Sequence, residues 1–186
     1  MPLNHVNIVE IVALQDASNQ NQSAVIQLKA GARMKPYTVE IEIDLPRDQV
    51  IEIFDNQENM FHWQNGLQDI QHLSGQPGQN GARSLLVYQN GKHRIELTET
   101  ITNRNLPDGF DGCYEWGGGK NTLKNRFVEL GGSKTRWEST CEYEFKSLFL
   151  KLMGIFMPGM FKKQNMQFLQ NFKAFCESGE SVEGVE

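Results

Sequence analysis

Glu99 is the residue whose position in the sequence best suits chemistry. It falls on the same face of a predicted strand as Ile95, Leu97 and Ile101, because side chains two residues apart on a strand share a face. A carboxylate among apolar side chains is costly unless it finds a partner or water. Three environments would meet that need: a water-filled cavity, a buried ion pair, or a strand edge near solvent. In a cavity its pKa would rise, and Glu99 would be the candidate acid or base.

Aromatic side chains with polar ends lie along the other predicted strands. They are Tyr88, Tyr114, Trp116, Trp137 and Tyr143. Such a group can orient a ligand with one hydrogen bond while its ring packs against the ligand, although each also suits a plain core.

In the alternating segment "TRWESTCEYEF", two small residues face inward between large ones and leave room. The candidate cavity residues on strands are Tyr88, Leu97, Glu99, Trp116, Trp137, Ser139, Cys141 and Tyr143.

The stretch "MGIFMPGMFKKQNMQFLQNFKAFC", residues 153–176, carries four of the seven methionines and five of the eleven phenylalanines. Its apolar residues recur at helical spacing, and flexible methionine side chains suit an adaptable binding surface as well as an irregular core. The candidate cavity residues here are Phe156, Met157, Met160, Phe161 and Phe168. Pro158 is tolerated in a first turn, which predicts that the main helix begins there. Residues 148–157 would then be a separate segment beside the cavity entrance, or the helix is simply kinked.

No motif for a metal, nucleotide or triad is present. The four histidines and three cysteines lack metal-ligand spacing, so we expect neither a metal nor another cofactor. In "EWGGGKN", Tyr114 and Asn121 occupy positions where a phosphate-binding loop requires glycine and Ser or Thr. The odd number of widely spaced cysteines gives no disulfide framework and favours a reducing compartment.

Composition and charge narrow the class of protein. A chain of 186 residues with 39% hydrophobic and 22% charged residues is typical of one globular domain. A net charge of −5 argues against nucleic-acid binding. The longest nearly apolar run, residues 148–161, is shorter than the roughly 20 residues of a membrane span. Because the N-terminus lacks the pattern of a signal peptide, we expect a cytoplasmic protein without an integral membrane segment. Peripheral membrane contact and oligomeric state are left open.

The chain divides into three parts. Residues 1–33 are rich in Asn and Gln and form an N-terminal extension, either disordered or a short hairpin. Residues 34–178 form the ligand-binding domain, and residues 179–186 are an acidic tail. Within the domain, one alternating strand at 37–44 precedes two short helices, the second carrying Met60, Phe61 and Trp63. About six antiparallel strands follow, with a hairpin at Asn90-Gly91, and then the long helix.

This order of elements resembles the START-like superfamily, also called SRPBCC, and within it the bacterial polyketide-cyclase and lipid-transport-like proteins. The matching phrases are "YTVEIEIDLPRDQVIEIFDNQENMFHWQNGL", "ETITNRNLPDGF", "KTRWESTCEYEF" and "LMGIFMPGMFKKQNMQFLQNFKAF". The resemblance implies an α+β helix-grip fold. In that fold a curved antiparallel sheet of about seven strands wraps around the C-terminal helix and leaves a cavity between them.

The resemblance also implies a range of functions. Members bind lipids, sterols, quinones, polyketides or hormones, and some catalyse cyclisation or dehydration. We therefore expect a carrier or sensor of a hydrophobic or amphipathic small molecule. The alternative is a cyclase, aromatase or dehydratase acting on a polyketide-like substrate, with Glu99 and a tyrosine as acid and base. A third reading is a docking module of quinone-binding type, in which residues 148–161 contact a membrane or partner. Binding without catalysis is favoured, and whether the protein is an enzyme is left open.

Overall fold

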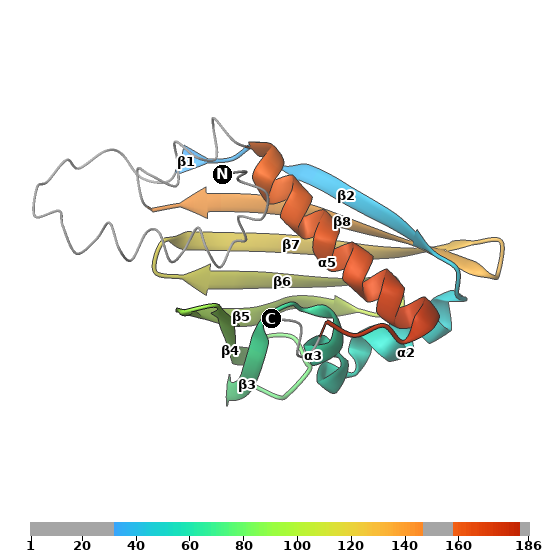
Figure 1. Cartoon of the computed structure of the whole chain (residues 1–186), viewed down its shortest axis with the longest axis horizontal. Helices are drawn as coiled ribbons and strands as arrows, with labels where there is room; N and C mark the ends of the chain where they lie inside the picture. Colours follow the sequence, from blue (N-terminus) through green and yellow to red (C-terminus); the bar gives the residue numbers. More distant parts are fainter. Residues whose placement is uncertain (1–31, 147–157, 183–186) are drawn as a thin grey trace, which may run out of the picture.

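The computed structural model describes residues 32–146 and 158–182. They form one antiparallel sheet, with a long helix lying across one face and short helices at one end (Figure 1). The strands are β1 (Ala32–Arg33), β2 (Tyr37–Ile43), β3 (Leu67–Ser74), β4 (Arg83–Asn90), β5 (His93–Asn105), β6 (Gly109–Trp116), β7 (Gly119–Leu130) and β8 (Lys134–Phe145). The helices are α2 (Arg47–Asp55), the 3₁₀ helix η1 (Gln57–Asn59), α3 (Met60–Trp63) and α5 (Pro158–Ser178).

The sheet order confirms the predicted helix-grip α+β architecture. Strands β3 to β8 are hydrogen-bonded in chain order, so each pairs with the next as a meander. Both β1 and β2 pair with β8, which gives seven strand positions across the sheet. The expected boundary at Met34 falls just after β1, whose Ala32 and Arg33 pair with the end of β8. Residues 1–31 lie outside the described part of the chain.

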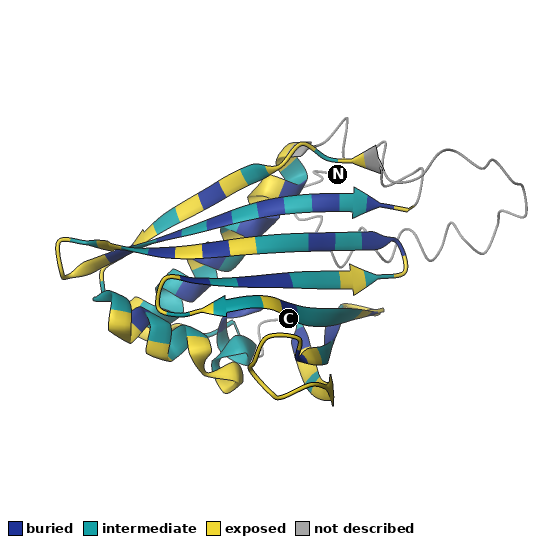
Figure 2. Ribbon diagram, turned by 180° about the vertical axis from the view of Figure 1, so that it is seen from behind, coloured by how far each residue is buried: buried dark blue, intermediate teal, exposed yellow. Residues whose placement is uncertain are grey.

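The strand β8 shows why the sequence pattern predicted a one-sided sheet. From Thr135 to Phe145 every second residue is buried, while the residues between them are partly exposed. The same alternation is visible along the strands when the sheet is seen from behind (Figure 2). The buried residues face α5, and the others form the outer surface.

Two sequence predictions differ in detail from the structure. The hairpin between β4 and β5 is confirmed, but its two loop residues are Gly91 and Lys92, one residue later than Asn90-Gly91. Gly91 has φ +56°, a conformation that glycine adopts without strain. The strand β3 was not located in the sequence. Its pairing with β4 shifts register twice and most of its residues are exposed, so no regular alternation marks it.

The predicted helices are confirmed where they are described. The short helices α2 and α3 follow the first long strand, and the long helix α5 is described over Pro158–Ser178. Its predicted start at Pro158 stays a prediction, because the residues just before it lie outside the described part of the chain. The segment expected beside the cavity entrance, residues 148–157, lies outside the described residues, and so does most of the proposed docking segment. Among residues 32–146 and 158–182, no helix combines the length and apolar character needed to cross a membrane.

Two packed clusters hold α5 against the sheet. Under its C-terminal half, the fully buried Phe172 contacts the rings of Phe54, Trp63 and Trp137. Under its N-terminal half, Phe161 packs with the aromatic residues at the end of β8. The helix is therefore fixed at two places, and the residues between them lie over the middle of the sheet.

We predict that Phe172→Ala lowers the free energy of unfolding by about 3–5 kcal/mol, because it removes a buried ring shared by three elements. Urea denaturation followed by circular dichroism measures this. Leu73→Ala is the control, since Leu73 is 50% exposed and its truncation should change stability by less than about 0.5 kcal/mol. Equal effects of the two substitutions would contradict this account of the core.

Candidate functional site

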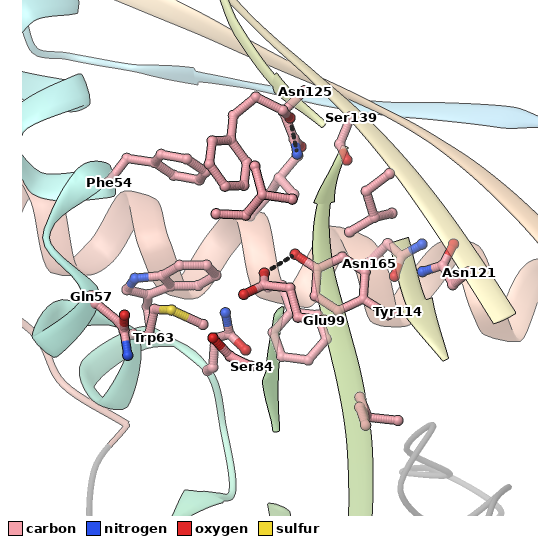
Figure 3. Close-up of a pocket in the computed structure, with 18 of the residues that line it drawn as sticks. Phe54, Gln57, Trp63, Ser84, Glu99, Tyr114, Asn121, Asn125, Ser139 and Asn165 are labelled. Atoms are coloured by element: carbon pink, nitrogen blue, oxygen red, sulfur yellow. Dashed lines mark hydrogen bonds between the residues drawn. The ribbon is translucent and has the colours of Figure 1, made fainter. Parts of the chain in front are cut away.

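A cavity of about 190 Å³ lies between the middle of α5 and the concave face of the sheet. Strands β4 to β8 supply one wall, α5 supplies the other, and α2 and α3 close one end. Apolar and aromatic side chains make up the larger part of its lining, and polar side chains lie among the rings (Figure 3). This combination is common in small-molecule binding sites.

The structure brings seven of the candidate residues together around this cavity. They are Tyr88, Leu97, Glu99, Trp116, Trp137, Ser139 and Phe168. The structure places Cys141, Tyr143, Phe161 and Met160 instead in the packed cluster under the start of α5. The ring of Phe161 contacts Tyr143 and Phe145, which fills the space at that point. Phe156 and Met157 lie outside the described residues.

Several lining residues were not among the candidates. Asn121 and Asn125 on β7 line the cavity, as do Ser84 on β4 and Asn165 on α5. Period-two alternation in "NTLKNRF" already places both asparagines of β7 on the face shared with Leu123. Polar residues on a predicted inward face are therefore the signal that would have found them.

Glu99 and Tyr114 form the central polar pair of the cavity. They are direct partners on β5 and β6, and the Tyr114 hydroxyl donates a hydrogen bond to Glu99 Oε1 at 2.8 Å (Figure 3). Burial raises the pKa of Glu99, and the bond from Tyr114 opposes that rise. Burial, with the nearby Glu99 carboxyl, also raises the pKa of Tyr114. The pair is thus a weakly solvated acid beside a protonated phenol.

Gly112 allows Tyr114 to take this position. A Cβ atom at residue 112 would lie 3.0 Å from Cε2 and 3.1 Å from the hydroxyl oxygen of Tyr114. Contacts this close would force the ring to move, so the absence of a side chain lets it lean over the strand. A glycine two residues away in the sequence thereby helps to position the Glu99 partner.

Two further hydrogen bonds orient lining residues. The Tyr88 hydroxyl donates to Gln64 Oε1, and burial raises the pKa of Tyr88. At the other end, Trp137 Nε1 donates to Asn125 Oδ1 at 3.0 Å, while Asn125 Nδ2 donates to the Phe110 carbonyl at 2.9 Å. These polar groups already have partners and act as fixed parts of the wall.

An ion pair lies at one side of the cavity, between β5 and the end of α2. The guanidinium of Arg104 donates to both carboxylate oxygens of Asp55, at 2.5 and 2.6 Å. The hydrogen bonds from Asp55 raise the pKa of Arg104. Both residues line the cavity, as do the exposed Gln57 and Gly78. We therefore regard this region as the cavity mouth.

Three buried polar atoms that belong to lining residues have no hydrogen-bond partner among the described residues. They are Trp63 Nε1, Trp116 Nε1 and Asn121 Oδ1. An unsatisfied buried donor or acceptor costs about 1–3 kcal/mol, so such atoms are points where a bound molecule would gain hydrogen bonds. Within residues 32–146 and 158–182, no group of three or more His, Cys, Asp or Glu side chains is arranged to hold a metal ion.

Comparison with solved structures places this geometry in a known fold. The protein TTHA0849 from Thermus thermophilus matches with a TM-score of 0.63 and 14% identity, over 79% of this chain and 100% of that one. The Zhui aromatase/cyclase from Streptomyces sp. R1128 matches with a TM-score of 0.64 and 10% identity, over 77% and 94%. Norcoclaurine synthase from Thalictrum flavum, in complex with dopamine and hydroxybenzaldehyde, matches with a TM-score of 0.60 and 13% identity, over 87% and 99%.

The chain has the START-like, or SRPBCC, fold. The resemblance noted from the sequence is confirmed at the level of the fold. No family model matches the chain, and no curated protein matches its sequence. The START-like fold therefore explains why a cavity lies under α5, and the chemistry must be argued from the lining residues themselves.

We predict a pH-dependent stability difference between the native protein and Glu99→Gln. Burial raises the pKa of Glu99 above its ordinary value of 4.5, so the unfolded chain ionises first as the pH rises. The free energy of unfolding of the native protein therefore falls from pH 4.5 up to the raised pKa, whereas the variant lacks this loss. If the acid dissociation constant of Glu99 is tenfold smaller in the folded protein than in the unfolded chain, the free energy of unfolding of the native protein falls by about 1.4 kcal/mol relative to the variant.

Thermal unfolding from about pH 4 to about pH 8 measures this difference. Glu115→Gln, which removes an exposed carboxyl on β6, is the matched control for loss of one charge. A stability difference for Glu99→Gln that stays constant with pH would mean that the Glu99 carboxyl is hydrated, and would contradict its placement in the cavity wall.

Proposed function

We propose that the protein binds a hydrophobic or amphipathic small molecule in the cavity under α5, as a carrier or sensor. The observation that carries this proposal is an internal cavity lined by rings, with buried polar atoms that lack partners among the described residues. Apolar burial would supply most of the affinity, and a few hydrogen bonds would fix orientation. Lipids, quinones and polyketide-like compounds are the classes of ligand that this lining suits.

One further observation supports the proposal. One of the similar solved structures holds dopamine and hydroxybenzaldehyde, which are small ring compounds with polar groups. We also propose that the protein works in the reducing cytoplasm, with which its three free cysteines agree.

We predict that the full chain binds the uncharged fluorescent probe N-phenyl-1-naphthylamine at one saturable site, with a rise in probe fluorescence as it leaves water. Leu97→Trp should weaken this binding at least about tenfold, because the larger ring occupies cavity volume. Fluorescence titration measures both, and native mass spectrometry of the same sample would detect any molecule that co-purifies.

Leu73→Trp is the matched control, because it makes the same substitution at an exposed site on β3. We expect its affinity for the probe to equal that of the native protein. If Leu97→Trp bound the probe as tightly as the native protein, the probe would be on the surface and the cavity proposal would fail.

An enzyme of cyclase or aromatase type is the second candidate function. It is favoured by the bond between Tyr114 and Glu99, which places a carboxyl with a raised pKa inside the cavity. A base whose pKa lies nearer neutrality removes a proton more effectively than an ordinary carboxylate. Ionised Glu99 would take a proton from the carbon beside a ligand carbonyl, while the electron pair moves to the carbonyl oxygen and forms an enolate.

Hydrogen exchange tests this candidate. In D₂O the methyl protons of 2-acetylnaphthalene should exchange about 10²- to 10⁴-fold faster than in buffer, as followed by proton NMR. Glu99→Gln should remove the acceleration, whereas Glu115→Gln on the outer face should retain it. Exchange no faster than in buffer would exclude this reaction type and leave the binding function as it stands.

A further inference from the structure

Four polar side chains form one continuous row across the cavity wall. The strand register places Ser84 opposite Glu99, Glu99 opposite Tyr114, and Tyr114 opposite Asn121. The row crosses β4, β5, β6 and β7 in consecutive steps, and all four residues line the cavity. Figure 3 shows their side chains around the same space. We call these four residues the polar row.

Mostly apolar residues flank the polar row on both sides, with the indole of Trp116 beside Tyr114 on β6. On one side Leu86 lies opposite Leu97, and on the other Ile101, Gly112 and Leu123 are consecutive partners. The apolar residues Ile101, Gly112 and Leu123 therefore separate the polar row from the other polar part of the sheet wall, Asn125 and Ser139. A flat ligand lying over the row would meet its four polar groups along one line.

At one end of the polar row, the side-chain oxygen of Asn121 lacks a hydrogen-bond donor among the described residues. Asn121 is 7% exposed, and its Oδ1 atom has no hydrogen-bond partner among residues 32–146 and 158–182. A buried amide oxygen accepts hydrogen bonds and cannot donate them. A hydroxyl or N–H group on a bound molecule would satisfy this atom and remove an energetic cost.

In the middle of the polar row, the carboxyl group of Glu99 can donate a hydrogen bond to a ligand when it is neutral. One oxygen of Glu99 accepts the Tyr114 hydroxyl, and the other is the one left for a ligand. Burial raises the pKa of Glu99, against the opposing effect of the bond from Tyr114. A bound carbonyl would meet Glu99 in its neutral form, whereas the cyclase candidate would use the ionised form. A neutral carboxyl group carries an O–H donor. The other charged residues among the described lining, Asp55 and Arg104, are paired with each other at the mouth. Burial also keeps Tyr88 and Tyr114 protonated by raising the pKa of each. A carbonyl oxygen on the ligand is the natural partner for this donor.

The spacing of the strands sets the distance between the two groups. Glu99 on β5 and Asn121 on β7 are separated by one strand, and neighbouring strands lie about 4.8 Å apart, so their backbones are about 10 Å apart. Both residues line the same cavity, so a ligand that meets both must span a comparable distance. A pair of fused rings has this span.

We propose that the ligand is an apolar ring compound with a carbonyl oxygen held by Glu99 and, on its far side, a hydroxyl or amine donated to Asn121. This inference rests on the proposed binding function and specifies the ligand chemistry of the same cavity. Tyr114 is a positioning residue in this arrangement, because its hydroxyl fixes the orientation of the Glu99 carboxyl.

Three matched naphthalenes test the proposal on the full native chain, by displacement of N-phenyl-1-naphthylamine. They are 6-acetyl-2-naphthol with both groups, 2-acetylnaphthalene with the carbonyl alone, and 2-ethylnaphthalene with neither. We expect each added group to tighten binding about tenfold, since each pairs with a buried polar atom.

Variants assign each gain to its residue. Asn121→Leu should abolish the advantage of 6-acetyl-2-naphthol over 2-acetylnaphthalene. Glu99→Leu should abolish the advantage of 2-acetylnaphthalene over 2-ethylnaphthalene, whereas Glu99→Gln, which keeps an N–H donor, should retain it. If Glu99 only held the wall in shape, Glu99→Gln would not retain a preference for the ligand that carries the carbonyl.

The outcomes separate this inference from the function on which it rests. Equal affinities for the three naphthalenes in the native protein would overturn the inference alone, as would a hydroxyl advantage that persists in Asn121→Leu. If neither the fluorescent probe nor any naphthalene binds, the proposed cavity function fails as well. The native-protein series does not depend on whether the variants fold.

Discussion

The contact between the long C-terminal helix and the concave face of the sheet is the constraint on which the rest of the structure depends. Phe172 anchors one half of α5 among the rings of α2, α3 and β8, and Phe161 anchors the other half at the end of β8. Between these anchors, Gln164, Asn165 and Phe168 line the cavity, and Asn165 also hydrogen-bonds to Tyr37 on β2 and to Cys141 on β8. Two packed clusters thus hold the helix at a fixed height above the middle of the sheet.

This arrangement separates stability from function within one small domain. The aromatic clusters exclude water and supply much of the favourable burial. The cavity between them contains Glu99 with a raised pKa and an Asn121 oxygen without a partner among the described residues, which each reduce the stability of the empty protein. Groups of this kind are expected where a site has been kept at a cost to stability. Their location in one row across adjacent strands is what makes the cavity wall chemically specific.

The fold sets the location of the cavity, and the side chains set its chemistry. The similar solved structures share only 10–14% of their residues with this chain, yet the same backbone arrangement covers about four fifths of it. A curved sheet around a helix leaves space at the same place whatever residues line it. The polar row, the Gly112 contact with Tyr114 and the ion pair at the mouth belong to this sequence, so they carry more information on the ligand than the fold does.

The sequence by itself determined the order of the elements apart from β3, the long C-terminal helix, and the inward face of β8 with Trp137 and Ser139 on it. It also placed Glu99 on an inward face. Only the tertiary structure decided that Phe161 packs against Tyr143 and that Asn165 hydrogen-bonds to Cys141, although both strand residues share the inward face of Ser139. It also decided that β3 exists despite its irregular pattern. Periodicity determines toward which side of a strand a residue points, because it depends on local backbone geometry. What lies opposite that residue depends on how elements distant in the sequence pack together, and no local pattern records it.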